Sequence, residues 1–136
     1  MVKPICVFIV ASALIASAWA LTLSRDDDHA REAALQWLQV VDSGNYKDAA
    51  RMISEQVRVT RDWANYLSAN RGRLGRVNKR EIVEVEDRST IPGTAQIRNY
   101  DTVRFKTSFE RKPAAFEEVV TAKMGCCWEI FGYEIK

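Results

Sequence analysis

The segment RGRLGRVNKREIVEVED (Arg71–Asp87) decides the fold, because the spacing of apolar residues changes within it. Before Gly75 the apolar residues recur every three or four positions, which is the period of one helix face. After Gly75 the period becomes two, and valine alternates with glutamate over residues 83–86, as in a strand with one buried face. Helices that precede strands in this way favour an α+β fold.

Three helices are expected up to this segment. The first begins at Asp26–Asp28, where carboxylates suit the positive end of the helix dipole, and Gly44 closes it. Its apolar stripe consists of Ala30, Ala33, Ala34, Trp37, Leu38 and Val41. A short second helix has Tyr46, Ala49, Ala50 and Ile53 on one face. The third starts at an N-cap, Thr60, and ends at Gly75. Its stripe consists of Trp63, Tyr66, Leu67, Asn70 and Leu74.

Four strands joined by short loops are expected after Gly75, with a turn at Pro92-Gly93 between the first two. The core face of the second strand is Val103, Phe105, Thr107 and Phe109. In the third strand Phe116, Glu118, Val120, Ala122 and Met124 share one phase, and in the fourth Phe131, Tyr133 and Ile135 do. The sequence therefore predicts three N-terminal helices packed on a four-stranded antiparallel meander sheet, with a pocket between the layers.

The first twenty residues have the features of a secretory signal peptide. Lys3 precedes an uncharged apolar run, Ile5–Ala18, and the A-x-A pattern at residues 18–20 suits signal peptidase. We therefore expect residues 1–20 to be removed and residues 21–136 to form a single α+β domain, periplasmic or secreted.

The same segment has two alternative interpretations, an uncleaved membrane anchor and a lipoprotein signal. For an uncleaved membrane anchor the apolar run is near the lower limit of roughly 17–25 residues, and the small residues at its end favour cleavage. We therefore expect no stable membrane insertion once the segment is removed. A lipoprotein needs a lipobox before its cysteine, and Cys6 lies too close to the start of the run. The net charge of +2 indicates no nucleic-acid partner, and export argues against one as well.

Six motifs occur in a recognisable order along the chain. They are AALQWLQVVDSGNYKDAA (Ala33–Ala50), Trp63 followed by RGRLGRVNKR (Arg71–Arg80), Tyr100, FKTSFERK (Phe105–Lys112), EVVT (Glu118–Thr121) and WEIFGYEI (Trp128–Ile135). This pattern resembles a bacterial exported family, domain of unknown function 4019, and is similar to the wider class of cone-shaped nuclear-transport-factor-2-like domains. The resemblance implies a compartment and a shape but no reaction. One departure is the pair Cys126 and Cys127, where the family's last hairpin tends to carry a polar turn.

Glu118 is the residue of most chemical interest, because it shares the phase of the apolar residues in its strand. A buried carboxylate needs a partner. Arg71, on the flank of the third helix's stripe, is the best placed cation, whereas Glu117 has the opposite phase and is expected at the surface. Glu118 and Arg71 then form either a structural ion pair or, with Trp63 and Tyr100, the polar end of a ligand pocket.

The pair Cys126 and Cys127 leaves several states open. Consecutive Cα atoms lie about 3.8 Å apart, less than the roughly 4.4–6.8 Å of an ordinary disulfide, so a bond between them is strained. In a regular strand the two side chains point to opposite faces, and only a turn would bring them together. Unpaired thiols, a strained vicinal disulfide and an intermolecular bridge are all compatible with the sequence. A metal site is poorly supported, since His29 is the single histidine and no CxxC occurs. We expect a hairpin turn at Gly125 with no catalytic role.

No set of residues typical of catalysis, cofactor binding or metal binding is present, so we expect none of these. The leading hypothesis is an exported, non-catalytic domain that binds a partner protein or a small ligand between helices and sheet. The alternatives are a pocket enzyme that uses Glu118 with Tyr100 or Tyr66, and a structural envelope protein that acts through its surface. The basic cluster around Arg71–Arg80 could also attract anionic glycans or lipid headgroups.

Signal-peptide cleavage gives the first testable prediction. The mature protein should begin at Leu21, because Ala18 and Ala20 are the small residues that precede the charged stretch. Mass spectrometry of exported material checks this, and a mature chain that retains Lys3 would contradict it.

Overall fold

The computed structural model describes the backbone of residues 15–88 and 100–136 and the side chains of residues 27–87 and 100–136. The expected turn at Pro92-Gly93 lies outside these residues. The helices are α1 (Ile15–Asp42), α2 (Tyr46–Arg51), α3 (Glu55–Arg58), α4 (Trp63–Asn70) and the 3-10 helix η1 (Gly72–Leu74). The strands are β1 (Val77–Arg88), β2 (Tyr100–Phe109), β3 (Lys112–Met124) and β4 (Cys127–Ile135). Helices followed by strands confirm the α+β prediction.

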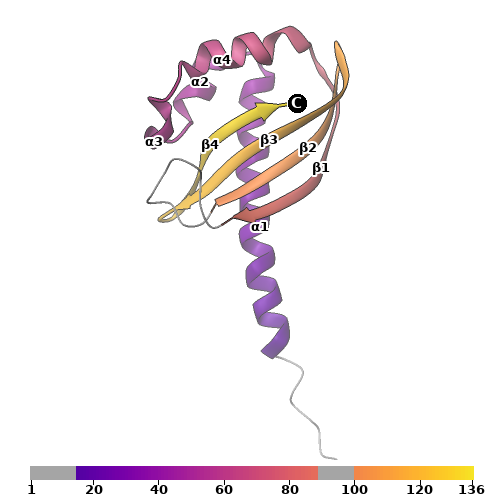
Figure 1. Cartoon of the computed structure of the whole chain (residues 1–136). Helices are drawn as coiled ribbons and strands as arrows, with labels where there is room; N and C mark the ends of the chain where they lie inside the picture. Colours follow the sequence, from indigo (N-terminus) through magenta and orange to yellow (C-terminus); the bar gives the residue numbers. More distant parts are fainter. Residues whose placement is uncertain (1–14, 89–99) are drawn as a thin grey trace, which may run out of the picture.

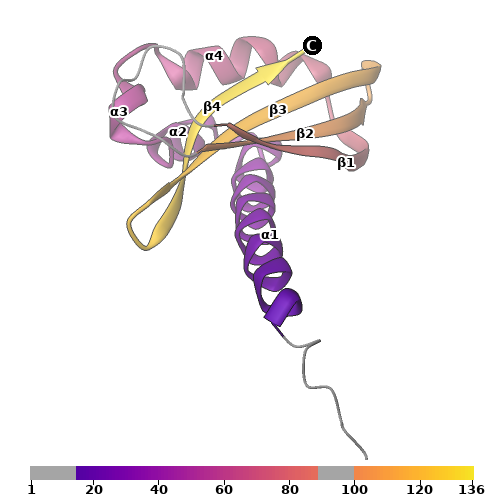
Figure 2. The ribbon, with the colours of Figure 1, turned by 60° about the horizontal axis from the view of Figure 1, so that its bottom comes forward.

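The four strands form one antiparallel sheet in the order β1-β2-β3-β4, which is the predicted meander. Helix α1 crosses one face of the sheet and contacts all four strands, while α2, α3 and α4 lie near β4 (Figures 1 and 2). The face of the sheet that packs on α1 is called the inner face below, and the opposite one the outer face. Among the described residues, no helix combines the length and the apolar character needed to cross a membrane.

The predicted stripe of the first helix is correct, but its start is not. Ala30, Ala34 and Trp37 are fully buried against the sheet, as are the next two members of the stripe. The helix begins at Ile15 rather than near Asp26 and passes through the expected cleavage position. The run before Asp26 is rich in Ala and Leu and contains neither Pro nor Gly from Ile15 onward, so nothing in it stops a helix.

The third predicted helix, expected from Thr60 to Gly75, corresponds to α4 and η1, and the short helix α3 before it was not predicted. Thr60 is not an N-cap; its hydroxyl donates to the carbonyl of Val57 (2.6 Å) just after α3. Asp62 caps α4 instead, and its carboxylate accepts the backbone N–H of Asn65 (3.2 Å). Both residues are N-cap types, and the carboxylate of Asp62 also suits the helix dipole.

Strand β2 has the predicted inner face, whereas β3 has the opposite phase from the one expected. Glu117 is 0 % exposed on the inner face, and Phe116, placed in the core by the sequence pattern, is 45 % exposed. The cause is a register shift between β2 and β3. Phe109 pairs with Lys112, but Thr107 pairs with Ala115, so β3 contains one extra residue next to Pro113. One extra residue exchanges the two faces of the positions that follow it, here up to Val119, whereas Ala122, predicted in the core, is 0 % exposed.

Gly75 turns the chain from η1 into the sheet with φ 76° and ψ −156°, a combination that essentially only glycine adopts. A Cβ atom there would also lie 2.9 Å from the Cβ of Glu110. Gly44, after α1, has φ 80°, but a Cβ atom there would meet nothing within 4 Å.

The two glycines give a matched comparison. Gly44→Ala should lower the free energy of unfolding by about 1–2 kcal/mol, the cost of a left-handed residue, and Gly75→Ala by about 3 kcal/mol, because strain and a clash add. Urea denaturation of both variants measures this difference. An equal or larger loss for Gly44→Ala would contradict the described geometry.

Candidate functional site

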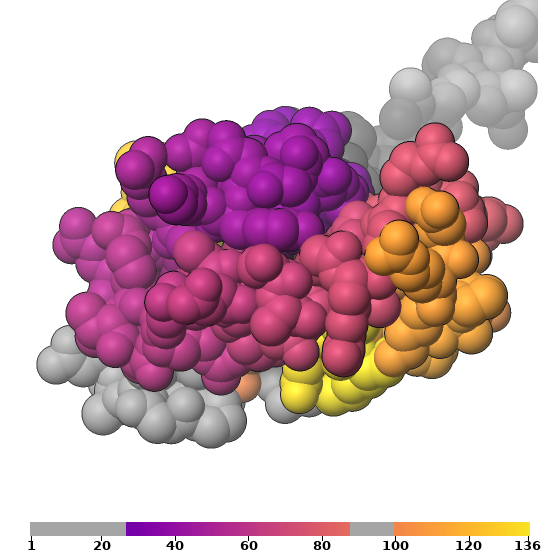
Figure 3. Space-filling model, turned by 90° about the horizontal axis from the view of Figure 1, so that it is seen from above, coloured from indigo at the N-terminus to yellow at the C-terminus, as the bar shows by residue number. Residues whose placement is uncertain are grey.

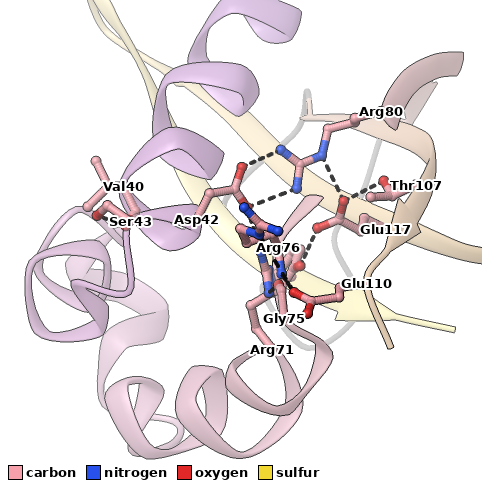
Figure 4. Close-up of polar contacts among 11 residues, drawn as sticks. Val40, Asp42, Ser43, Arg71, Gly75, Arg76, Arg80, Thr107, Glu110 and Glu117 are labelled. Carbon is pink, nitrogen blue, oxygen red and sulfur yellow. Dashed lines mark hydrogen bonds and ion pairs between the residues drawn. The ribbon is translucent and has the colours of Figure 1, made fainter. Parts of the chain in front are cut away.

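A cluster of ionised and hydroxyl groups lies between the end of α1 and the inner face of the sheet (Figure 4). Asp42 is the last residue of α1, Arg80 comes from the edge strand β1, and Glu117 comes from β3. Arg80 faces inward because it pairs with Thr107, an inner-face residue of β2. We call Asp42, Arg71, Arg80, Glu117, Thr107 and Tyr133 the interlayer network.

Glu117 is the centre of the interlayer network. Its carboxylate accepts hydrogen bonds from the Nε of Arg80 (2.8 Å), the hydroxyl of Thr107 (2.5 Å) and the hydroxyl of Tyr133. A fully buried carboxylate is costly unless donors and a cation surround it, and here both are supplied. The three donors come from β1, β2 and β4, so this one side chain links all the other strands to β3.

Arg80 extends the network to the helix layer. Its Nη1 donates to Oδ2 of Asp42 (2.6 Å) and its Nη2 to Oδ1 (3.1 Å), a two-pronged contact that matches the carboxylate. Burial alone lowers the pKa of Arg80, but the hydrogen bond to Asp42 and the charge of Glu117 outweigh it and raise that pKa. Arg80 therefore stays charged and joins α1 to the sheet.

Tyr133 acts only as a donor in this environment. Burial, together with the charge of Glu117 and the hydrogen bond to it, raises the pKa of the Tyr133 phenol far above its usual value. Its ring also packs edge to face on Trp37, with centroids 5.1 Å apart. A phenol held in this way is unsuited to act as a base or a nucleophile.

Arg71 completes the network from the helical side. Its Nη2 donates to Oδ1 of Asp42 (3.2 Å) and its Nη1 to the carbonyl of Gly75 (2.6 Å), while its guanidinium lies 4.6 Å from the centroid of Phe109. Its buried Nε has no hydrogen-bond partner. The network thus contains two cations and two carboxylates that largely satisfy one another, which is the arrangement of a structural clamp.

The predicted pair of Glu118 and Arg71 is wrong. Glu118 lies on the outer face, where its carboxylate accepts from Arg104 (3.0 and 3.1 Å) and from Lys136 (3.3 Å). Arg104 also donates to Glu84 (2.8 Å), so charges alternate across the outer face from β1 to β4. This outer ladder is half-exposed, and surface ion pairs of this kind contribute little stability.

The other predicted site residues are not gathered around Glu118. The indole N–H of Trp63 donates to the carbonyl of Val57 (3.1 Å). Tyr100 is buried on a rung four residues from Glu118 along β3, a separation of about 13 Å at 3.3 Å per residue. Tyr66 donates to the carbonyl of Tyr133 (3.1 Å). Neither tyrosine is placed to work with Glu118.

Cys126 and Cys127 lie at the tip of the β3–β4 hairpin, as predicted, and both are free and exposed in the structure. The pKa of the Cys127 thiol is raised mainly by hydrogen bonding with Cys126. The charge of Cys126 and burial raise it further. A raised thiol pKa disfavours the reactive thiolate that a redox catalyst needs. Among the described side chains, no group of three or more His, Cys, Asp or Glu residues could hold a metal ion.

A basic cleft of about 310 Å³ lies where η1 meets the β2–β3 hairpin. It is lined by Asn70, Arg73, Leu74, Arg111, Lys112 and Ile135. The hairpin is fixed there by the backbone hydrogen bonds from Arg111 to Leu74 (2.9 Å) and from Glu110 to Arg76 (2.8 Å). In Figure 3 the η1 region, the orange hairpin and the yellow end of β4 adjoin one another on this face.

Comparison with known proteins supports the family predicted from the motifs. A family model described as "Protein of unknown function (DUF4019)" matches residues 33–133. No curated protein and no solved structure matches the chain. The likeness to nuclear-transport-factor-2-like domains stays a prediction.

Two neighbouring glutamates test the interlayer network. Glu117→Ala should destabilise the protein by about 3–5 kcal/mol, because it leaves Arg80 buried beside an empty position. Glu118→Ala removes only half-exposed ion pairs and should cost about 1 kcal/mol or less. Chemical denaturation of the two variants measures both values. Similar losses at both positions would contradict the assignment of Glu117 to the inner face.

Proposed function

The chain belongs to the DUF4019 family, and we propose that it is an exported, non-catalytic domain that binds a small anionic ligand in the basic cleft. The observation that carries this proposal is the convergence of Arg73, Arg111 and Lys112 on one cleft whose lining contains no carboxylate. The three cations come from η1, the hairpin turn and the start of β3.

The cations of the cleft differ from the arginines inside the domain. Arg71 and Arg80 are bonded to carboxylates, which balance their charges. Arg111 donates from Nη1 to the carbonyl of Arg73 (3.2 Å), which orients its side chain without neutralising it. A guanidinium has five N–H donors, so most of them remain available to an anion.

The remaining lining residues indicate the kind of ligand. Leu74 and Ile135 supply apolar surface, and the Asn70 amide donates from its nitrogen to the carbonyl of Tyr66 (2.8 Å), which leaves its oxygen as an acceptor. Arginine pairs bind carboxylate, sulfate and phosphate groups through parallel hydrogen bonds. We expect a phosphate, sulfate or carboxylate group attached to a short apolar part, in a cleft of small-molecule size.

Three further observations support a non-catalytic and exported role. The buried carboxylate of Glu117 is occupied by its three donors, so it is not placed to move a substrate proton. Glu118, the acid of the alternative enzyme hypothesis, is held by Arg104 and Lys136. The signal-peptide pattern at residues 1–20 supports export.

Calorimetric titration of the purified exported protein tests this proposal. Butyl phosphate should bind more tightly than inorganic phosphate, and butanol should not bind, because the cleft recognises both the anion and the apolar part. The double variant Arg73→Gln/Lys112→Gln should lose about tenfold in affinity or more, since a hydrogen bond to a charged group contributes at least about 1.5 kcal/mol.

The matched control is Lys47→Gln/Lys106→Gln, which removes two exposed cations outside the cleft. It should leave the affinity unchanged, and added salt should weaken binding to the wild-type protein. Equal affinity of the two double variants, or no binding of either phosphate at millimolar concentration, would refute the proposal.

A further inference from the structure

Three sulfur atoms occur within four residues at the tip of the β3–β4 hairpin, in the sequence MGCC (Met124–Cys127). Gly125 and Cys126 form the two-residue turn, and Met124 pairs with Cys127 as the last rung of the ladder. This tip is at the other end of β3 from the basic cleft (Figure 2). The inference below is therefore independent of the proposed function.

The turn brings together side chains that a regular strand would separate. Gly125 has φ 62°, and Cys126 has no positive φ, the pattern of a type II′ hairpin turn. Directly paired residues such as Met124 and Cys127 have Cβ atoms about 4.5–5.5 Å apart and share a face. Cys126 lies in the turn itself, next in sequence to Cys127, and its thiol is near enough to raise the pKa of the Cys127 thiol.

The three sulfur atoms differ in how firmly they are held. Met124 is partly buried and packs against the main core, so its thioether has a restricted position. Cys126 and Cys127 are exposed and free, so they can adjust around a bound ion. A second thioether, that of Met52, lines the same cleft of about 400 Å³ as Met124.

We propose that Met124, Cys126 and Cys127 form a three-sulfur binding site for the cuprous ion. Thiolate and thioether sulfur are soft ligands of the kind that favour Cu(I). On binding, each thiol loses its proton to solvent and both sulfur atoms coordinate the ion. Copper enters and remains as Cu(I), so no electron is transferred. Structural zinc sites need four N or S ligands, and the turn Met124–Cys127 supplies three sulfur atoms.

The test is an anaerobic titration of the reduced, purified protein with Cu(I) in competition with the chromogenic chelator bicinchoninate. We expect one Cu(I) per chain. Cys126→Ser and Cys127→Ser should each abolish competition with the chelator. Met124→Leu, which keeps the shape of the side chain but removes the sulfur, should weaken binding by at least about tenfold, the loss that even outer-shell partners give.

Met52→Leu is the matched control, because it changes a methionine of the same cleft that lies outside the turn. It should bind Cu(I) as the wild type does.

Thermal unfolding of each variant without copper separates loss of the site from loss of the fold, since all the variants should unfold near the wild-type temperature. If Met124→Leu binds Cu(I) with the affinity of the wild type, the two thiols alone hold the ion and the three-sulfur site is wrong. Failure of the wild type to compete with the chelator would overturn it as well.

Discussion

The carboxylate of Glu117 is the constraint on which the rest of the structure depends. It is completely buried, so it must be surrounded by donors and by a cation, or the two layers cannot close over it. Its hydrogen bonds reach Arg80, Thr107 and Tyr133 on three different strands. Arg80 then bonds Asp42 at the end of α1, which sets where the helix ends over the sheet. Apolar packing has no preferred direction and alone would let α1 shift along the sheet. The hydrogen bonds prevent this shift, because they have narrow ranges of length and angle.

Much of the fold could be predicted from the sequence, and the main error has one local cause. The stripe of α1 and the alternation of β2 were predicted correctly, because each is a long run with a clear period. A regular two-residue turn after Phe109 would place Phe116 opposite Phe105 on the inner face. The extra residue beside Pro113 places Glu117 there instead. Proline lacks the N–H that a strand ladder needs, so it is often found at a bulge. Pro113 was therefore the one signal in the sequence for the register shift. The start of α1 was missed because nothing between Ile15 and Asp26 stops a helix, and the start of α4 was missed because Thr60 and Asp62 are competing caps.

The interior and the surface of this domain use charge in different ways. In the interlayer network every cation has a carboxylate, and the result is a rigid connection between layers that leaves Glu117 without contact to solvent. In the basic cleft, Arg73 and Lys112 have no such partner among the described residues, and their free donors are what a ligand would use. The same rigid sheet separates this cleft from the sulfur atoms at the far hairpin tip. The proposed anion site and the proposed copper site therefore lie at opposite ends of β3.

The coupling between Arg80 and Glu117 is the most direct measure of the central claim that the buried carboxylate of Glu117 holds the arginine that reaches Asp42 on α1. A double-mutant cycle with Arg80→Met, Glu117→Leu and both together, followed by urea unfolding, gives this quantity. If the pair acts as described, the double variant should lose less stability than the two single variants added together, with an interaction energy of about 1–3 kcal/mol. If the losses add within about 0.5 kcal/mol, the two side chains stabilise the protein independently, and the account of the interlayer network is wrong.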